Sequence, residues 1–315
     1  MQKKCSKNLH ICNFCSNFAR KLIFMSEFWK RTLSGAVYVG AVVGSILWHP
    51  IAFSALFLVI CTWAVVEFHN LMGSPRALRD GAAVATVLLW LASQWHLFAP
   101  SCLRGSGIYI VLATGYILII LALLIDELWH KAENPIGNWG NLLISQMMIA
   151  LPFCAMGALL TVDKWLLLAL FVLIWVNDSG AYCVGSMTAK RPQGNHKMFP
   201  RVSPKKSWEG LVGGIAFAIL AALVLQHFGW FDILTATVIR PIAYVIVVGF
   251  ALIACVFGNL GDLMESLFKR TIGVKDSGRF LPGHGGVLDR FDSMLLATPI
   301  ILVYSCLCYF VWSVV

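Results

Sequence analysis

Long apolar runs separated by short polar segments dominate the chain. Each run is near the roughly 20 residues that a helix needs to cross a bilayer. The runs occupy residues 33–48, 50–68, 82–99, 107–125, 141–161, 165–186, 210–227, 240–260 and 291–313. The first two are interrupted only at His49 and Pro50, and proline disrupts a helix and disfavours helical geometry just before it. We predict an all-α, polytopic membrane protein of about nine transmembrane helices, whose first two form a tight hairpin rather than one kinked helix.

Composition and charge agree with this prediction and suggest an orientation. Of the 315 residues, 59% are hydrophobic and 12% are charged, a balance typical of a multi-span membrane protein. With nine spans, all but three of the 24 lysines and arginines lie on the side of the N-terminus; the exceptions are Arg104, Lys164 and Arg240. Cytoplasmic loops carry the excess of these residues, so the N-terminus should be cytoplasmic. No recognition motif accompanies the basic charge, and we expect no nucleic-acid partner.

The expected spans divide the chain into three parts. Residues 1–24 form a leader, residues 25–164 carry spans one to five, and residues 165–315 carry spans six to nine with cytoplasmic loops at 187–209 and 261–290. The leader contains Cys12-x-x-Cys15 but no second ligand pair at the spacing of a zinc site. We therefore expect a disordered extension there and place the chemistry in the third part.

Acidic residues at membrane depth are the first candidates for that chemistry, because a carboxylate there is costly and usually functional. Glu67, near the end of the second span, is a weak candidate. Three stronger ones lie at or near the cytoplasmic ends of spans six, eight and nine: Asp178, Asp262 and Asp289.

The segment 258–270 is expected to continue span eight as a helix. Spacings of three and four residues place Asp262, Glu265, Ser266 and Lys269 on one face of that helix. The alternative is an ordinary amphipathic helix end with a Glu265–Lys269 ion pair.

The segment 275–293, KDSGRFLPGHGGVLDRFDS, is rich in both glycine and charge. Glycine lets backbone N–H groups approach phosphate oxygens closely, and lysine and arginine neutralise them. Mg²⁺ prefers one or two carboxylates together with substrate phosphates, which suits Asp262 and Asp289.

A second basic loop, SPKKSWEG at 203–210, brings Lys205 and Lys206 to the start of span seven. Ser203 and Pro204 look like the N-cap and first turn of that helix. A helix N-terminus with two lysines is also suited to anions. Both loops lie on one side of the expected topology, so they can converge.

Residues 266–293, SLFKRTIGVKDSGRFLPGHGGVLDRFDS, resemble the signature of the CDP-diacylglycerol synthase, or phosphatidate cytidylyltransferase, family. That signature reads Ser-x-apolar-Lys-Arg, then Lys-Asp, Pro-x-His-Gly-Gly and Asp-Arg-x-Asp, and this chain matches it throughout. SPKKSWEG and NDSGAY at 177–182 resemble the family too, so the likeness covers about residues 170–295.

The resemblance implies a magnesium-dependent, often dimeric enzyme of the bacterial inner membrane. It would make CDP-diacylglycerol and pyrophosphate from CTP and phosphatidic acid on the cytoplasmic side. The implied metal ligands are Asp262 and Asp289, with Asp292 and Asp178 as further candidates. The implied catalytic residues are Asp262, Asp289, Lys275, His284 and Arg290. The implied substrate-binding residues are Lys205, Lys206, Ser203, Ser266, Lys269, Arg270, Gly283, Gly285 and Gly286.

Two readings remain beside this one. A CTP-dependent enzyme acting on another lipid acceptor would use the same nucleotide site. In an ion-coupled transporter, by contrast, Asp178 and Asp262 would bind the ion. For His284 we favour a hydrogen bond to a substrate phosphate. The alternative is a structural role, in which His284 holds the glycine-rich loop in place by hydrogen bonding to backbone carbonyls.

Overall fold

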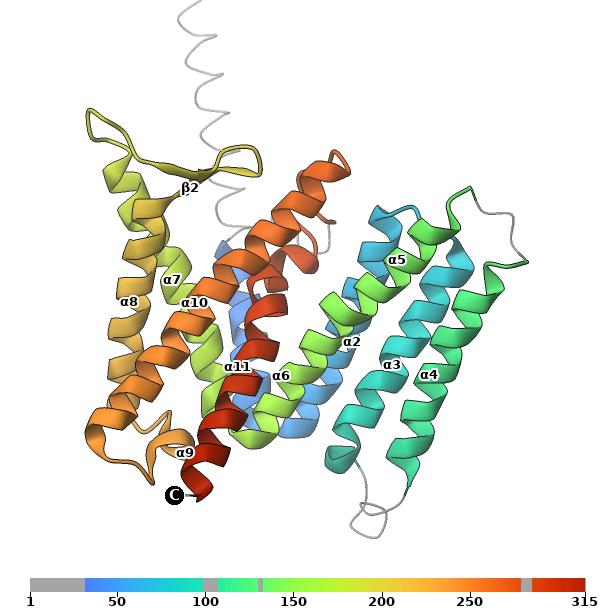
Figure 1. The fold of residues 1–315 in the computed structure, drawn as a ribbon, viewed down its shortest axis with the longest axis horizontal. Coiled ribbons are helices and arrows are strands. Elements are labelled where there is room, and N and C mark those ends of the chain that lie inside the picture. Colours follow the sequence, from blue (N-terminus) through green and yellow to red (C-terminus); the bar gives the residue numbers. More distant parts are fainter. Residues whose placement is uncertain (1–31, 99–106, 130–132, 279–284, 315) are drawn as a thin grey trace, which may run out of the picture.

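The computed structural model describes residues 32–98, 107–129, 133–278 and 285–314, which are mostly helical (Figure 1). The leader at 1–24 lies outside these residues. A first helix, Thr32–Trp48, precedes the labelled elements. These are α2 (Pro50–Leu71), α3 (Arg76–Phe98), α4 (Ile108–Asp126), α5 (Pro135–Ser145), the π-helical turn η2 (Gln146–Ala150), α6 (Leu151–Val162), α7 (Lys164–Thr188), β1 (Lys197–Phe199), β2 (Ser203–Ser207), α8 (Trp208–His227), α9 (Asp232–Thr235), α10 (Arg240–Thr271) and α11 (Leu288–Val314).

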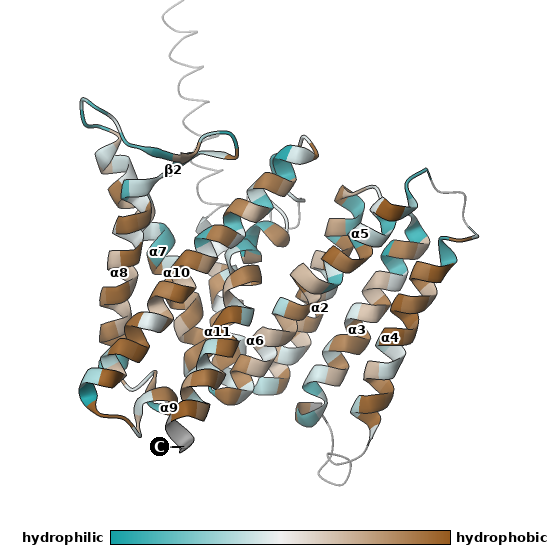
Figure 2. Ribbon diagram, viewed as in Figure 1, coloured by the Kyte–Doolittle hydropathy of each residue, from teal (hydrophilic) through white to brown (hydrophobic). Residues whose placement is uncertain are grey.

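The prediction of an all-α, polytopic membrane protein is confirmed. Within the described residues, seven helical segments are long and apolar enough to cross a bilayer: α2, α4, the continuous Pro135–Val162, α7, α8, α10 and α11. Apolar residues dominate the lengths of these helices (Figure 2). The other two expected spans correspond to the shorter Thr32–Trp48 and to α3, which is not among the seven. The count of nine spans therefore stays a prediction.

The first two helices form the predicted hairpin. His49 is extended and caps α2, its Nδ1 accepting the N–H of Ile51 at 3.2 Å, and Pro50 occupies the first turn. On either side of this break, the rings of Tyr38 and Phe57 both lie 5.7 Å from the ring of Phe291. Nineteen residues of continuous helix would span about 28 Å, so the chain must reverse at His49.

An aromatic cluster joins the two halves of the chain at the start of α11. The ring of Phe291 lies 5.7 Å from Phe57 of α2, 5.1 Å from Phe153 of α6 and 6.4 Å from Phe171 of α7. All four rings are buried. Phe291 directly follows Asp289 and Arg290, so this core holds the end of the glycine-rich segment in place.

The loop expected at 187–209 contains a short antiparallel β-hairpin, β1 with β2. The prediction that Ser203 and Pro204 cap and begin a helix is wrong, because both lie in strand β2. The N-cap of α8 is instead Ser207, whose hydroxyl accepts the N–H of Gly210 at 3.2 Å. Lys205 and Lys206 therefore project from an extended strand rather than from a helix N-terminus.

The loop expected at 261–290 is mostly helical at its beginning. Helix α10 continues to Thr271, as the pattern of residues 258–270 predicted, and α11 begins at Leu288. The connection between these helices thus begins at Ile272.

Candidate active site

Charged residues gather at one end of the helix bundle. There the β-hairpin and the C-terminal turns of α10 lie at the top of the view, with the first turn of α11 below them (Figure 1), and hydrophilic residues are frequent in these elements (Figure 2). The two basic loops predicted to face the same side therefore do so.

Lys206 of β2 joins the hairpin to α10. Its Nζ lies 2.8 Å from Asp262 Oδ2 and donates to the carbonyl oxygen of Asn259 at 3.3 Å. The second oxygen of Asp262 accepts the hydroxyl of Ser266 at 3.2 Å. This ion pair brings the SPKK loop against the acidic face of α10, the helix that leads into the glycine-rich segment.

A small pocket with several charged lining residues lies beside this ion pair. It has a volume of about 210 Å³, and its charged lining residues are Asp178 of α7, Lys205, Lys206 and Asp262. The close approach of α8 to α7 on one side of the pocket depends on glycine, since a Cβ at Gly214 would lie 2.6 Å from the carbonyl oxygen of Asn177. The pocket thus combines two lysines and two carboxylates from three separate elements, α7, β2 and α10.

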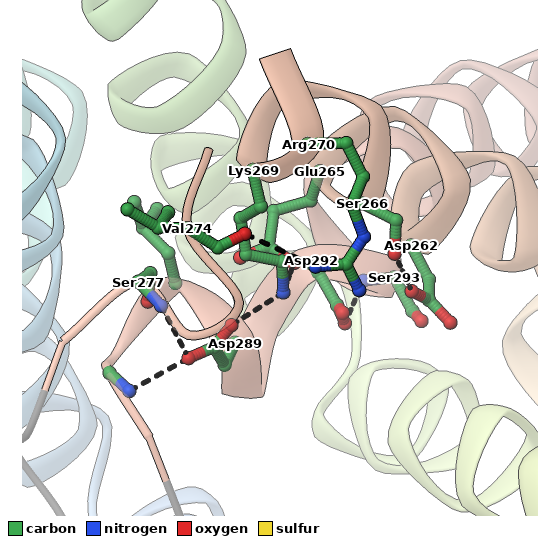
Figure 3. Close-up of polar contacts among 12 residues, drawn as sticks. Asp262, Glu265, Ser266, Lys269, Arg270, Val274, Ser277, Asp289, Asp292 and Ser293 are labelled. Carbon is green, nitrogen blue, oxygen red and sulfur yellow. Dashed lines mark hydrogen bonds and ion pairs between the residues drawn. The ribbon is translucent and has the colours of Figure 1, made fainter. Parts of the chain in front are cut away.

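Lys269 forms a second, more buried charge network where α10 meets α11 (Figure 3). Its Nζ lies 2.6 Å from Glu265 Oε2, one helical turn away, and 2.6 Å from Asp289 Oδ1. The Lys269 side chain is only 11% exposed and that of Glu265 only 7%. Lys269 therefore pairs with two carboxylates at once, although its single positive charge offsets only one of them. Its predicted contact with substrate phosphate would require exchanging one of these partners.

Asp289 organises the two ends of the glycine-rich segment. Its Oδ2 accepts the N–H groups of Ser277 and Gly286, both at 2.9 Å, while Oδ1 faces Lys269 (Figure 3). Gly285 has a φ of +82°, and a Cβ there would collide with the Asp289 carboxylate. The signature glycine at this position thus permits both the turn and the close approach of the acid.

The other cationic signature residues, Arg270, Lys275 and Arg290, form none of the contacts described for this buried network. Arg270 is exposed and donates from Nη1 to the carbonyl oxygen of Val274 at 3.1 Å, and Lys275 is exposed nearby. Arg290 is partly buried, and its carbonyl accepts the hydroxyl of Tyr38 at 3.3 Å. Their predicted roles toward phosphates remain predictions.

The remaining predicted residues are placed as follows. Ser203 pairs with Phe199 in the hairpin, and Gly286 is buried beside Asp289. His284 and Gly283 lie outside the described residues.

Comparisons with known proteins identify the family of this chain. A sequence model of the cytidylyltransferase family matches residues 29–308. The phosphatidate cytidylyltransferase of Bacillus subtilis (strain 168) is 32% identical over 281 residues, covering 87% of this chain and 96% of its own. The protein of that name from Haemophilus influenzae is 32% identical over 290 residues, covering 86% and 96%. That of Staphylococcus aureus (strain COL) is 44% identical over 131 residues, covering 42% and 45%.

The chain belongs to the cytidylyltransferase family. It is therefore a nucleotidyltransferase in a multi-pass membrane fold. Its described charge clusters at this end of the bundle are the Lys206–Asp262 pocket and the Lys269–Asp289 network.

The four candidate acids of this cytidylyltransferase differ in how available their carboxylates are to Mg²⁺. Asp178, Asp262 and Asp292 interact electrostatically with one another, and their surplus negative charge favours a bound cation. Asp262 is 33% exposed toward the pocket. In Asp289, by contrast, Lys269 and two amides already engage both oxygens. Across the described ranges no three histidine, cysteine or acidic side chains are grouped as they are in a protein-only metal site.

Two residues that contact each other at the signature loop, Glu67 and Ser277, could not be assigned to the site from the sequence. Glu67 was a weak candidate, yet its carboxylate contacts Ser277, Val287 and Leu288 at both ends of the signature loop. The sequence signal for it is a single acid within an otherwise apolar second span. Ser277 carries no distinguishing signal beyond its position in the signature.

Proposed function

We propose that this cytidylyltransferase is a phosphatidate cytidylyltransferase that converts CTP and phosphatidic acid to CDP-diacylglycerol and pyrophosphate in phospholipid synthesis. The observation that carries the proposal is the Lys206–Asp262 ion pair, which assembles basic and acidic side chains from β2 and α10 around one pocket. The names of the full-length bacterial relatives supply the acceptor.

The pocket suits the phosphates of a nucleotide. Its volume of about 210 Å³ is below the roughly 300–1,000 Å³ of sites that enclose a whole small molecule, so it fits phosphate groups rather than a complete CTP. An oxygen of the lipid phosphate would attack the α-phosphorus as the bond to the β-phosphate bridge breaks, and pyrophosphate would leave with the electron pair. Lys205 and Lys206 would align the triphosphate and offset its charge.

Magnesium is part of the proposal. Asp178 and Asp262 would hold the ion at the pocket, with Asp292 close by and Asp289 as the other ligand implied by the resemblance. When bound, the ion would supply positive charge to the phosphate oxygens of the transition state. The side chains themselves bind and orient the phosphates.

A membrane-facing crevice supports a lipid acceptor. It has a volume of about 730 Å³, is lined along α2 by apolar side chains such as Leu58 and Trp63, and ends at Ser277 and Gly278 of the signature loop. An acyl chain lying there would bring its headgroup to the charged end of the bundle. We further propose that this end faces the cytoplasm of a bacterial inner membrane, where CTP is found, and that the enzyme acts as a homodimer.

The test uses purified protein in mixed micelles with Mg²⁺, phosphatidic acid and CTP labelled in either the α- or the γ-phosphate. The proposal predicts that the α-label enters the lipid while the γ-label appears in pyrophosphate. Transfer of the γ-label to lipid would instead identify a lipid kinase. If the α-label enters lipid only when another lipid acceptor replaces phosphatidic acid, the proposed nucleotide site stands but phosphatidic acid is not the substrate.

A further inference from the structure

Glu67 is a buried carboxylate on α2, more than 200 residues away in sequence from its partners. Only 7% of the residue is exposed. Oε1 accepts the hydroxyl of Ser277 at 2.5 Å and the N–H of Leu288 at 3.2 Å, and Oε2 accepts the N–H of Val287 at 3.1 Å. All three of these donors are neutral, so Glu67 serves here as an acceptor of hydrogen bonds from the signature segment.

Two of these donors belong to the beginning of α11. The first N–H groups of a helix have no partner within the helix, and the partial positive charge at a helix N-terminus attracts anions. Leu288 is the first residue of α11 and Val287 precedes it. Glu67 therefore caps α11 from another helix and fixes where α11 begins, one residue before Asp289.

The third donor, Ser277, lies at the opposite end of the signature loop. Its hydroxyl donates to Glu67 and its N–H donates to Asp289 Oδ2 at 2.9 Å. Asp289 also accepts the N–H of Gly286 at 2.9 Å. Two carboxylates, one from α2 and one from α11, thus hold residues 277 and 286–288 against each other.

Two glycines beside Glu67 leave no room for a side chain. A Cβ at Gly278 would lie 2.6 Å from Glu67 Oε2, and a Cβ at Gly286 would collide with both Glu67 Oε1 and the Ser277 hydroxyl. The backbone on both sides of the loop is therefore packed directly on the Glu67 carboxylate.

We infer that Glu67 is a positioning residue for nucleotidyl transfer. It clamps Ser277 against Val287 and Leu288 and thereby sets the position of Asp289 relative to the Lys206–Asp262 pocket. Glu67 does not line that pocket, but it lines the crevice along α2 where that crevice meets Ser277 and Gly278. This inference rests on the proposed function, and it assigns a catalytic contribution to the N-terminal half of the chain.

Glu67→Gln is the sharpest perturbation, because it keeps the shape of the side chain but replaces one acceptor oxygen with a donor. The NH₂ group would then face a backbone N–H or the Ser277 hydroxyl and leave a buried donor without an acceptor. We expect kcat for CDP-lipid formation to fall about ten- to hundredfold, the size of effect that one unsatisfied buried group produces. The KM for CTP should change less than about threefold, because nucleotide binding does not use Glu67.

The matched control is Glu127→Gln at the end of α4. Glu127 is also a partly buried carboxylate of the N-terminal half, but its Oε1 accepts from Asn138 Nδ2 at 2.9 Å and it does not contact the signature loop among the described residues. This variant should keep wild-type kcat and KM.

Ser277→Ala should lower kcat as well. The kcat of the double variant Glu67→Gln/Ser277→Ala should be no lower than that of Glu67→Gln alone, because both changes break the same clamp.

The measurements are steady-state rates of full-length protein with phosphatidic acid micelles, and hydrogen exchange of the amides of Val287 and Leu288. Faster exchange at these amides in Glu67→Gln, together with the kcat loss, supports the clamp. A Glu67→Gln variant with at least half the wild-type kcat, or with a raised KM and unchanged kcat, overturns it. If Glu67→Gln does not fold, an unchanged kcat in Ser277→Ala overturns it. A wild-type protein without CDP-lipid synthesis refutes the proposed function, while the exchange data still decide the clamp.

Discussion

Replacing Lys206 with methionine tests the proposed nucleotide pocket. The change removes the ammonium that lies 2.8 Å from Asp262 Oδ2 and 3.3 Å from the carbonyl of Asn259, in a side chain only 20% exposed. A hydrogen bond to a charged group contributes about 1.5–3 kcal/mol. If Lys206 gives an interaction of that size to the transferring phosphates, kcat/KM for CTP should fall roughly ten- to hundredfold.

The assay is the initial rate of labelled CDP-lipid formation as a function of CTP concentration. Lys206→Arg should retain more activity than Lys206→Met because it keeps the charge. Lys197→Met is the matched control, because Lys197 is exposed on the other strand of the same hairpin and outside the pocket; its kcat/KM should stay within about twofold of wild type. A Lys206→Met enzyme with more than half of the wild-type kcat/KM would refute the assignment of this pocket to the triphosphate.

Three further predictions concern the acids, a glycine and the leader. Asp262→Asn and Asp289→Asn should each abolish turnover while leaving a folded protein in circular dichroism, because they remove charge at nearly constant volume; half-maximal activity at ordinary Mg²⁺ would contradict the metal assignment. Gly286→Ala should also inactivate the enzyme, since its Cβ would overlap the Glu67 carboxylate; a fully active variant would show that the loop relaxes easily. Deletion of residues 1–24 should leave the specific activity nearly unchanged, because the family match begins at residue 29; loss of turnover in correctly inserted protein would contradict this.

The local features of the site could be predicted from the sequence. Spacings of three and four residues predicted that Asp262, Glu265, Ser266 and Lys269 share one face of a helix, and the structure contains the Ser266–Asp262 and Lys269–Glu265 contacts. His49 and Pro50 predicted the first hairpin for a similar reason, because proline acts on its immediate neighbours. Helical periodicity and the backbone effect of proline involve residues close in sequence, so the sequence alone predicts them.

The errors and omissions arose where distant contacts decide the outcome. Ser203-Pro204 is a good helix start by local preference, but pairing with β1 places it in a strand and Ser207 becomes the cap. The link between Lys269 and Asp289 spans 20 residues and that between Glu67 and Ser277 spans 210. Neither sequence separation matches the period of a helix or a strand. The contacts that clamp the signature loop therefore depend on how α2 packs against α10 and α11, which the sequence pattern does not predict.

The central claim is that carboxylates from separate membrane helices hold a cation that binds the triphosphate at one end of the bundle. It is tested most directly by an experimental structure with Mn²⁺ and an unreactive CTP analogue, in which anomalous scattering locates the ion. We expect a peak coordinated by Asp262, in the pocket shared with Asp178, and phosphate density beside Lys205 and Lys206. A nucleotide-bound ion that none of the four predicted acids coordinates would contradict the account.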